Sequence, residues 1–264
     1  MYDFTYAKPG SLSDAVKLLS GDMDAKALAG GQTIIPVLKQ RLNKPSTVVD
    51  LSKLGLSGIT ISGNTITIGA MTRHVDIANN ADIRAKIPGL ADQASWIGDE
   101  AVRHRGTMGG SLANNDPAAC YPSALLALGG TIKTDRRSIA ADDFFQGMFT
   151  TALEQGEIIT AIELPIPEKS AYEKFRNPAS RYAIVGVFVA KFASGVRLAI
   201  TGASQGGVFR HAAMEQALSA KFSVDAIAGI VTPEDGLNGD IHASAEYRAH
   251  LIGVVSKRAV AKAT

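Results

Sequence analysis

The sequence predicts an α+β protein with two unequal domains. Strand-like and helix-like patterns alternate irregularly along its 264 residues. A polar stretch with two prolines, residues 165–170, is the best candidate for a domain boundary. Hydrophobic residues make up 46% of the chain and charged residues 20%, which is typical of an ordinary globular protein. A chain of this length buries a sizeable core without disulfide or metal crosslinks.

The N-terminal part predicts a helix and several short strands. Ser11 follows a Lys-Pro-Gly turn and is placed to cap a helix with an apolar face. Residues 26–29 form a short apolar run that ends at two glycines, which predicts a strand entering a tight loop, and residues 47–51 predict another strand. Alternating Thr and Ile around Gly63-Asn64 indicate a β-hairpin.

The middle of the chain predicts helices at residues 73–80 and 88–97. The glycine-rich stretch 106–111 is predicted to be a loop that precedes a second apolar helix, with Asp116 as its cap and Pro117 at its first position. Two strands are predicted within 130–140 and one at 157–164. The remaining expectations are strands at 172–176, 184–192 and 196–201, helices near 211–220 and 223–230, and a final helix capped by Ser244.

Charge, cysteine content and hydropathy exclude several classes of protein. Lys and Arg number 27 against 25 Asp and Glu, and a formal net charge of +2 argues against a strongly basic nucleic-acid binder. Cys120 is the single cysteine, so this chain forms no internal disulfide and no zinc or iron–sulfur site from several cysteines. No run approaches the roughly 20 apolar residues of a membrane span, and the first ten residues lack a secretory signal. A cytoplasmic location is expected.

Familiar catalytic motifs are absent from the sequence. It contains no P-loop, no strand–GxGxxG–helix unit, no HExxH and no GxSxG. Its five histidines lack metal-ligand spacing and are expected on the surface or in turns, and Cys120 has no obvious base nearby. We therefore predict no catalytic residue and no metal site.

Two glycine loops are the most informative feature. Residues 29–33 read AGGQT after a predicted strand, and residues 106–111 read GTMGGS. Glycines allow backbone N–H groups to approach an anion, and successive N–H groups form an anion-binding nest, so the loops could hold a cofactor diphosphate. Plain turns explain the same residues, and the loops alone do not decide between the two interpretations.

Six segments resemble one family in the order in which that family carries them. They are AGGQTIIPVLKQRL from Ala29, IGAMTRHVDI from Ile68, IGDEAVRHRGT from Ile97, RGTMGGSLANNDPAACYPSALLALGGTI from Arg105, DDFFQGMFTTAL from Asp142 and SAEYRAHLIGVVSKRAV from Ser244. Together they resemble the FAD-binding medium subunit of the molybdenum hydroxylases, the xanthine dehydrogenase and aerobic carbon monoxide dehydrogenase family.

The resemblance implies a fold and a domain division. Residues 1–168 are expected to form a two-lobed FAD-binding domain of the vanillyl-alcohol-oxidase/PCMH type, with lobes of approximately 1–57 and 58–168. Residues 169–264 are expected to form a small C-terminal α+β domain of the CO dehydrogenase flavoprotein type.

The resemblance also implies the cofactor contacts. The first loop carries over Ala29, Gly30, Gly31, Gln32 and Thr33, with Ile34 beside them. The second loop carries over Gly106, Thr107, Gly110 and Ser111, and Asn114 and Asp116 are implied as polar contacts to the dinucleotide. Ile97 and Lys174 are implied near the flavin, and Tyr182 beside the isoalloxazine ring. Four of these also fit purely structural roles: Ile34, Ile97 and Tyr182 as core residues, and Lys174 as a solvated strand residue.

The chain departs from the family pattern at Cys120, where many relatives carry Asp. A thiol is a weak donor and supplies no carboxylate acceptor. A contact to the cofactor is therefore either lost here or taken over by water or by Asp116.

The implied function is that of an electron-transfer flavoprotein subunit. In the family, a molybdopterin centre on a large subunit oxidises the substrate, two [2Fe–2S] clusters on a small subunit relay the electrons, and FAD on the medium subunit passes them to an external acceptor. The expected assembly is a dimer of heterotrimers without nucleic acid. Two alternatives stay open: a free-standing FAD-dependent oxidase of the vanillyl-alcohol type, and a non-enzymatic scaffold that has lost FAD.

Overall fold

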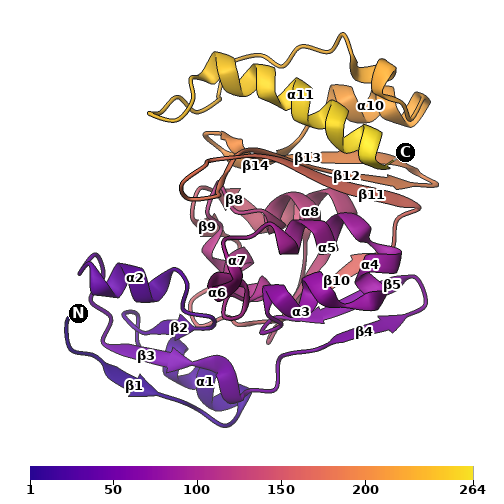
Figure 1. Cartoon of the computed structure of the whole chain (residues 1–264). Coiled ribbons are helices and arrows are strands. Elements are labelled where there is room, and N and C mark those ends of the chain that lie inside the picture. Colours follow the sequence, from indigo (N-terminus) through magenta and orange to yellow (C-terminus); the bar gives the residue numbers. More distant parts are fainter. Residues whose placement is uncertain (264) are drawn as a thin grey trace.

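The computed structural model describes residues 1–263, which form three larger β-sheets with helices packed between and around them. Figure 1 shows the N-terminal sheet at one end of the molecule and the C-terminal sheet with its helices at the other. None of the described helices is both long and apolar enough to cross a bilayer.

The first sheet is small and parallel, with strand order β1-β3-β2. Its elements are β1 (Thr5–Ala7), α1 (Leu12–Ser20), β2 (Lys26–Leu28), α2 (Ile34–Lys39), β3 (Thr47–Asp50) and the short 3-10 helix η1 (Leu51–Lys53). Ser11 caps α1 as predicted, because its side chain accepts the N–H of Asp14. Ala15, Leu19 and Val49 form a separate core that also receives Ile158 from much later in the chain.

The second sheet is antiparallel, with strand order β4-β5-β10-β6-β7. Its strands are β4 (Ile59–Ser62), β5 (Thr65–Gly69), β6 (Thr131–Thr134), β7 (Ser138–Ala140) and β10 (Ile159–Pro165). The hairpin predicted at Gly63-Asn64 is confirmed, with Ser62 paired to Thr65 and Gly63 at a φ of 56°. This left-handed conformation favours glycine.

Seven helices and one short hairpin belong to the same part of the chain. They are α3 (His74–Asn79), α4 (Ala81–Lys86), α5 (Pro88–Ser95), α6 (Glu100–Arg103), α7 (Met108–Asn114), α8 (Tyr121–Leu128), α9 (Ala141–Phe144), β8 (Phe145–Gly147) and β9 (Thr150–Thr151).

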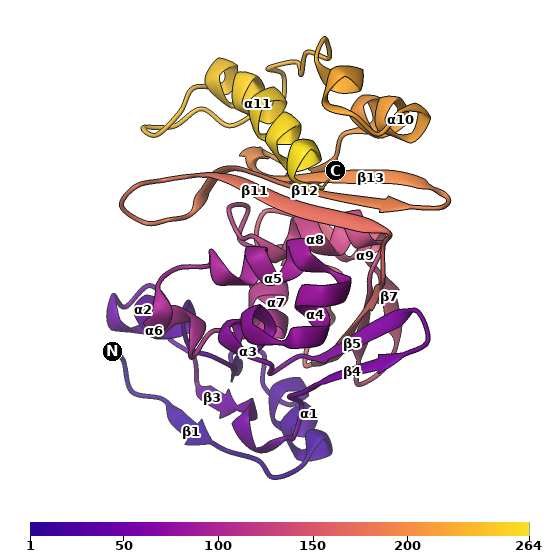
Figure 2. The ribbon, with the colours of Figure 1, turned by 45° about the vertical axis from the view of Figure 1, so that its right-hand side comes forward.

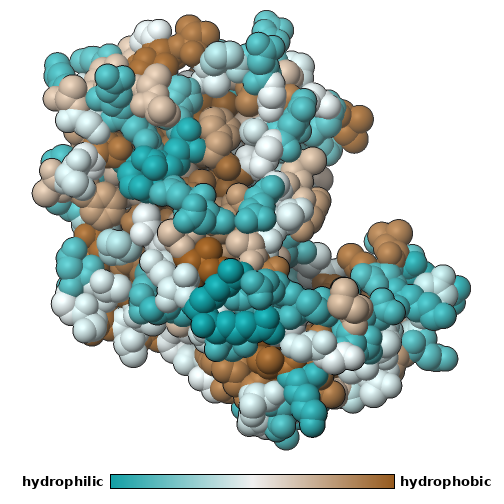
Figure 3. Space-filling view, turned by 180° about the vertical axis from the view of Figure 1, so that it is seen from behind, coloured by the Kyte–Doolittle hydropathy of each residue, from teal (hydrophilic) through white to brown (hydrophobic). Residues whose placement is uncertain are grey.

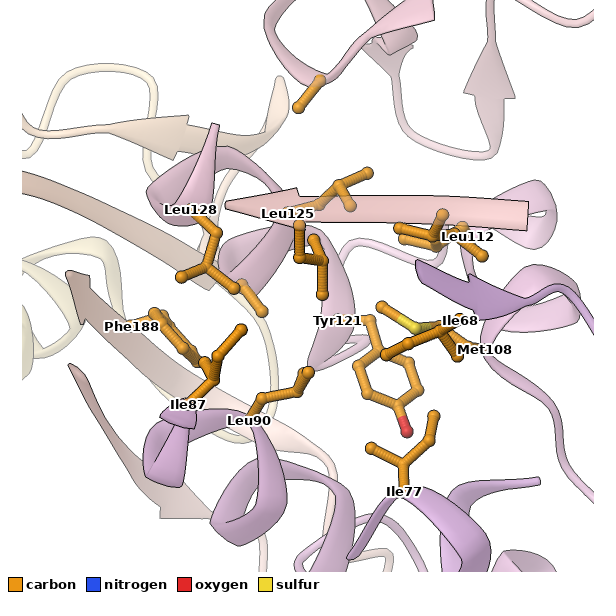
Figure 4. Close-up of a cluster of buried hydrophobic side chains, with 14 of the residues drawn as sticks. Ile68, Ile77, Ile87, Leu90, Met108, Leu112, Tyr121, Leu125, Leu128 and Phe188 are labelled. Carbon is orange, nitrogen blue, oxygen red and sulfur yellow. The ribbon is translucent and has the colours of Figure 1, made fainter. Parts of the chain in front are cut away.

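The third sheet is antiparallel, has the order β11-β12-β13-β14, and is covered on both faces. Its elements are β11 (Lys169–Arg176), β12 (Ala183–Phe192), β13 (Gly195–Ser204), β14 (Gly207–Arg210), α10 (Ala212–Ala220), the 3-10 helix η2 (Val224–Ile227) and α11 (Ala245–Ala263). Figure 2 shows α10 and α11 on one face and α5 and α8 on the other. Phe188 of β12 points to the second group and lies beside Ile87 and Leu128 (Figure 4).

Three local predictions are wrong. The stretch 106–111 is not wholly a loop, because α7 begins inside it at Met108 with Thr107 as its cap. No helix begins at Pro117: the carboxylate of Asp116 accepts the N–H of Ala118 in a turn, and the next helix, α8, starts at Tyr121. The helix expected at 223–230 is reduced to η2.

Candidate functional site

A deep notch separates the part of the molecule that carries α2 from its bulk. The space-filling view in Figure 3 shows this notch in profile, below the C-terminal sheet. The two glycine loops and the ends of several elements meet around this region, and they contain the residues that the sequence marks as candidates.

The two glycine loops touch one another. A Cβ added at Gly30 would lie 2.2 Å from the carbonyl oxygen of Arg105 and 2.7 Å from the Cα of Gly106. A Cβ added at Gly110 would lie 3.3 Å from the Cβ of Ala29. The approach at Gly30 requires glycine, because no larger residue fits against backbone at this separation, whereas Gly110 faces side-chain atoms. The structure therefore brings together two candidate segments that are more than seventy residues apart in sequence.

The first loop presents a row of free N–H groups. Within the part of the chain that the structure describes, the backbone N–H groups of residues 30–34 donate to no protein acceptor, and the loop's internal bonds begin only with Ile35 N–H to Gly31 oxygen. Gly31 supplies a φ of 77° in the middle of this row, and Gln32 and Thr33 are exposed. Consecutive unpaired N–H groups around a left-handed residue are a nest for an anion.

Most N–H groups of the second loop already donate to acceptors within the protein. The Met108 N–H donates to Thr72 oxygen at 3.1 Å, the Gly109 N–H to Ala70 oxygen at 2.8 Å and the Gly110 N–H to Thr107 Oγ1 at 3.2 Å. Among the described residues, the Ser111 hydroxyl has no partner. This loop therefore acts mainly as the rigid wall against which the first loop rests, and Ser111 is its available donor.

Behind the second loop lies a buried pair of rings. The ring centroids of His74 and Tyr121 are 5.3 Å apart. The backbone N–H of His74 donates to the backbone oxygen of Gly106 at 3.0 Å. Burial, helped by the charge of Arg103, lowers the pKa of His74 to about 4. Within residues 1–263, its Nδ1 and the Tyr121 hydroxyl are buried without a hydrogen-bond partner. The expectation that His74 lies on the surface or in a turn is wrong, because its buried ring fills the space behind Gly106.

A second cluster beside the loops contains Ile97, Asp116, Lys174 and Tyr182. Arg103 connects this cluster to the second loop. It lies three residues before Gly106, and its guanidinium donates to the carbonyl oxygens of Ile97 and Gly98. Burial raises the pKa of Tyr182, and the nearby charge of Asp116 raises it further. Tyr182 is 50% exposed, so it is no core residue.

Lys174 is not a solvated strand residue either. It is 8% exposed, and its Nζ donates to Trp96 oxygen at 2.8 Å, to Arg181 oxygen at 2.9 Å and to the Cys120 sulfur at 3.5 Å. The position of Cys120 is therefore occupied by a weak acceptor for a buried ammonium group. Burial raises the pKa of Asp116, whose charge acts on the nearby Tyr182.

Sequence reasoning missed Asn115, the neighbour of the candidate Asn114. Asn115 is 3% exposed and left-handed, with a φ of 43°. Its amide donates to Gly147 oxygen at 2.7 Å and to Thr150 oxygen at 2.8 Å, and its own carbonyl accepts the N–H of Phe149. An Asn directly after a helix is the signal that could have identified this position, because Asn tolerates the left-handed conformation at a helix end.

The residues fit a bound FAD. The diphosphate would meet the free N–H groups of residues 30–34 and the Ser111 hydroxyl, and Ile34, half-buried beside the nest, would contact it through apolar atoms. Tyr182 offers an exposed aromatic face, and Asp116 offers a carboxylate, for the flavin end. The chain thus offers donors that suit a diphosphate and an aromatic ring that suits a flavin.

Comparisons with known proteins identify the family. Residues 2–167 match the family described as the FAD binding domain in molybdopterin dehydrogenase. The chain is 35% identical to the glyceraldehyde dehydrogenase medium chain of Sulfolobus acidocaldarius, over 97% of each protein. It is 33% identical to the carbon monoxide dehydrogenase medium chain of Afipia carboxidovorans, over 98% of this chain and 96% of the relative.

Solved structures give the same result. The chain superposes on quinoline 2-oxidoreductase from Pseudomonas putida 86 with a TM-score of 0.89 and 29% identity, covering 99% of this chain and 97% of the other. Carbon monoxide dehydrogenase from Hydrogenophaga pseudoflava gives a TM-score of 0.89 at 33% identity, with the same coverage of both chains. The predicted α+β FAD-binding fold is confirmed, whereas the domain boundaries and the individual cofactor contacts stay predictions. The chain belongs to the FAD-binding medium subunits of the molybdenum hydroxylases, and it is therefore a subunit of an oxidoreductase.

Proposed function

We propose that this chain carries FAD in a heteromeric molybdenum hydroxylase and passes electrons from the [2Fe–2S] clusters of a small partner subunit to an external acceptor. The large partner subunit carries the molybdopterin, and the assembly is a dimer of heterotrimers in the cytoplasm. The partners follow from relatives that are named as medium chains of carbon monoxide dehydrogenase and as the xanthine dehydrogenase FAD-binding subunit.

One observation carries the proposal: the row of five free N–H groups in the first loop, held against the second loop by contacts that only glycine permits. The start of α2 accounts for the unpaired N–H groups of Thr33 and Ile34, because the first N–H groups of a helix have no partner within it, but the row extends back to Gly30. A diphosphate satisfies them without any lysine.

The chain's own residues have three tasks in this function. The N–H groups of residues 30–34 and the Ser111 hydroxyl bind the diphosphate and fix its position. Tyr182 and Asp116 orient the flavin end, and the buried wall of His74 and Tyr121 keeps the second loop rigid. When bound, FAD accepts electrons singly and releases them as a pair. No residue of this chain needs to act as an acid or base.

The test is a titration of the purified chain with FAD, followed by desalting and a visible spectrum. We expect flavin absorbance close to one FAD per chain, released on denaturation. A colourless, folded protein would contradict FAD binding and favour the scaffold alternative.

A second experiment addresses the electron route. The native complex is purified, and the reduction of its flavin is followed with and without the small subunit. We expect no reduction of the isolated, FAD-loaded chain by any substrate of the complex. Direct bleaching of the flavin by substrate in the isolated chain would favour a free-standing oxidase instead.

A further inference from the structure

Residues 177–182 form a tight turn between β11 and β12 that carries Tyr182 at its end. The N–H of Asn177 donates to Tyr182 oxygen at 2.8 Å, and the N–H of Arg181 donates to Asn177 oxygen at 2.9 Å. The Asn177 side chain accepts two further N–H groups from within the turn. These bonds fix the shape of the turn, but not its place relative to the rest of the site.

Arg181 attaches the turn to the body of the protein beside the candidate site, and Asn177 Nδ2 makes a second contact, 3.2 Å from His242 Nδ1. The φ of Arg181 is 63°, a left-handed conformation that is costly for a residue with a Cβ. Its carbonyl accepts from Lys174 Nζ at 2.9 Å, and its guanidinium donates to Gly98 oxygen at 3.3 Å. Strain of this kind persists only where surrounding contacts hold it. The direction of the next residue, Tyr182, is thus set at Arg181.

Lys174 has no hydrogen left for a ligand. An ammonium group has three N–H donors, and here they point to Trp96 oxygen, Arg181 oxygen and the Cys120 sulfur. These acceptors belong to the end of α5, the β11–β12 turn and the start of α8. A lysine that contacted the flavin directly would have to release one of them. Lys174 instead connects the candidate flavin site to the β11–β12 turn.

We propose that Lys174 is a positioning residue, which holds Tyr182 over the flavin end of the site by fixing the carbonyl of Arg181. This inference rests on the proposed function, because it concerns the same FAD site. It assigns the lysine a role through Tyr182 rather than a contact with the cofactor, and it gives Cys120 a role as the third partner of that lysine.

A double-mutant cycle tests the proposal. FAD affinity and the fluorescence yield of the bound flavin, which a neighbouring tyrosine ring quenches, are measured for the wild type, Lys174→Met, Tyr182→Ala and the double variant. Each single change should weaken FAD binding by roughly three- to tenfold, the size of one lost ring contact, and raise the fluorescence yield. Because both act through one ring, the double variant should be no worse than Tyr182→Ala alone.

Two further variants separate position from charge and guard against misfolding. Lys174→Gln retains two N–H donors without a charge and should keep much of the quenching if position is what matters. Arg181→Gly keeps the backbone carbonyl that Lys174 binds and favours the left-handed φ at this position, so it should retain the quenching by Tyr182. Lys191→Met, on the neighbouring strand and paired with exposed Glu168, is the matched lysine control and should change neither readout.

The outcomes are distinguishable. Additive losses in the double variant would show that the ammonium acts on the flavin independently of the ring and would overturn the proposal. An unchanged fluorescence yield in a folded Lys174→Met variant would overturn it as well. A wild-type chain that binds no FAD would refute the proposed function rather than this inference.

Discussion

Lowering the pH should destabilise the chain through His74, the buried histidine behind the second glycine loop. Burial lowers the pKa of His74 from 6.5 to about 4 in the folded state. Because the unfolded chain binds a proton at a higher pH than the folded chain, the free energy of unfolding falls as pH falls from 6.5 towards 4. With these two pKa values, the loss between pH 7 and pH 5 is about 2 kcal/mol, and below pH 4 it reaches roughly 3 kcal/mol.

Urea unfolding of the wild type and of His74→Phe at pH 7 and pH 5 measures this contribution. Phe keeps a ring against Tyr121 but does not titrate, so the variant should lose about 2 kcal/mol less stability over the same pH change. Burial also lowers the pKa of His211, and His211→Gln serves as the control that removes that separate contribution. Glu157 has a pKa of about 2 and stays ionised in this window. Equal pH dependence in the wild type and His74→Phe would refute the reasoning.

Three further predictions concern the loops and the hairpin. Gly30→Ala should weaken FAD binding by about 1–3 kcal/mol in a fluorescence titration, because its Cβ meets only backbone, whereas Gly10→Ala, with open space around it, should have no effect. Asn115→Ala should cost roughly 2–3 kcal/mol of stability in urea unfolding by leaving two hairpin carbonyls unpaired, and an equal loss for Asn114→Ala would argue against this account. Phe149→Gly should raise the Tm, since it relieves a φ of 56° worth about 1 kcal/mol, while Phe149→Ala keeps the strain and should not.

Local sequence patterns correctly predicted the elements that depend on interactions between residues close in sequence. The Gly63-Asn64 hairpin and the helix capped by Ser244 are present because the turn residues and the cap hydrogen bond lie within four residues of one another. The helix predicted at Pro117 is absent for a tertiary reason. Asp116 is drawn into a turn, and the carbonyl of Pro117 accepts the N–H of Gly202 from β13, far along the chain. A contact over such a sequence separation leaves no trace in a local pattern.

The candidate site shows the same division. Its residues could be chosen from the sequence through the resemblance, but the environment of Lys174 could not. Its three acceptors lie 78, 54 and 7 positions away, and they are two backbone carbonyls and one thiol, none of which belongs to a motif. Sequence patterns indicate which side chains are present. They do not indicate how many donors or acceptors of each side chain remain unpaired in the folded protein.

The two glycine loops make that distinction concrete, because the same residue type serves different purposes in each. In the second loop, a Cβ at Gly106 would lie 2.5 Å from His74 Nε2, and one at Gly109 would lie 2.6 Å from the Ala70 Cβ. These glycines allow close packing, and the N–H of Gly109 is already paired. In the first loop, Gly30 and Gly31 leave their N–H groups free. A glycine motif therefore does not measure the capacity to bind an anion; the number of unpaired N–H groups does, and by that measure we expect the anion on the first loop, with the second loop as its support.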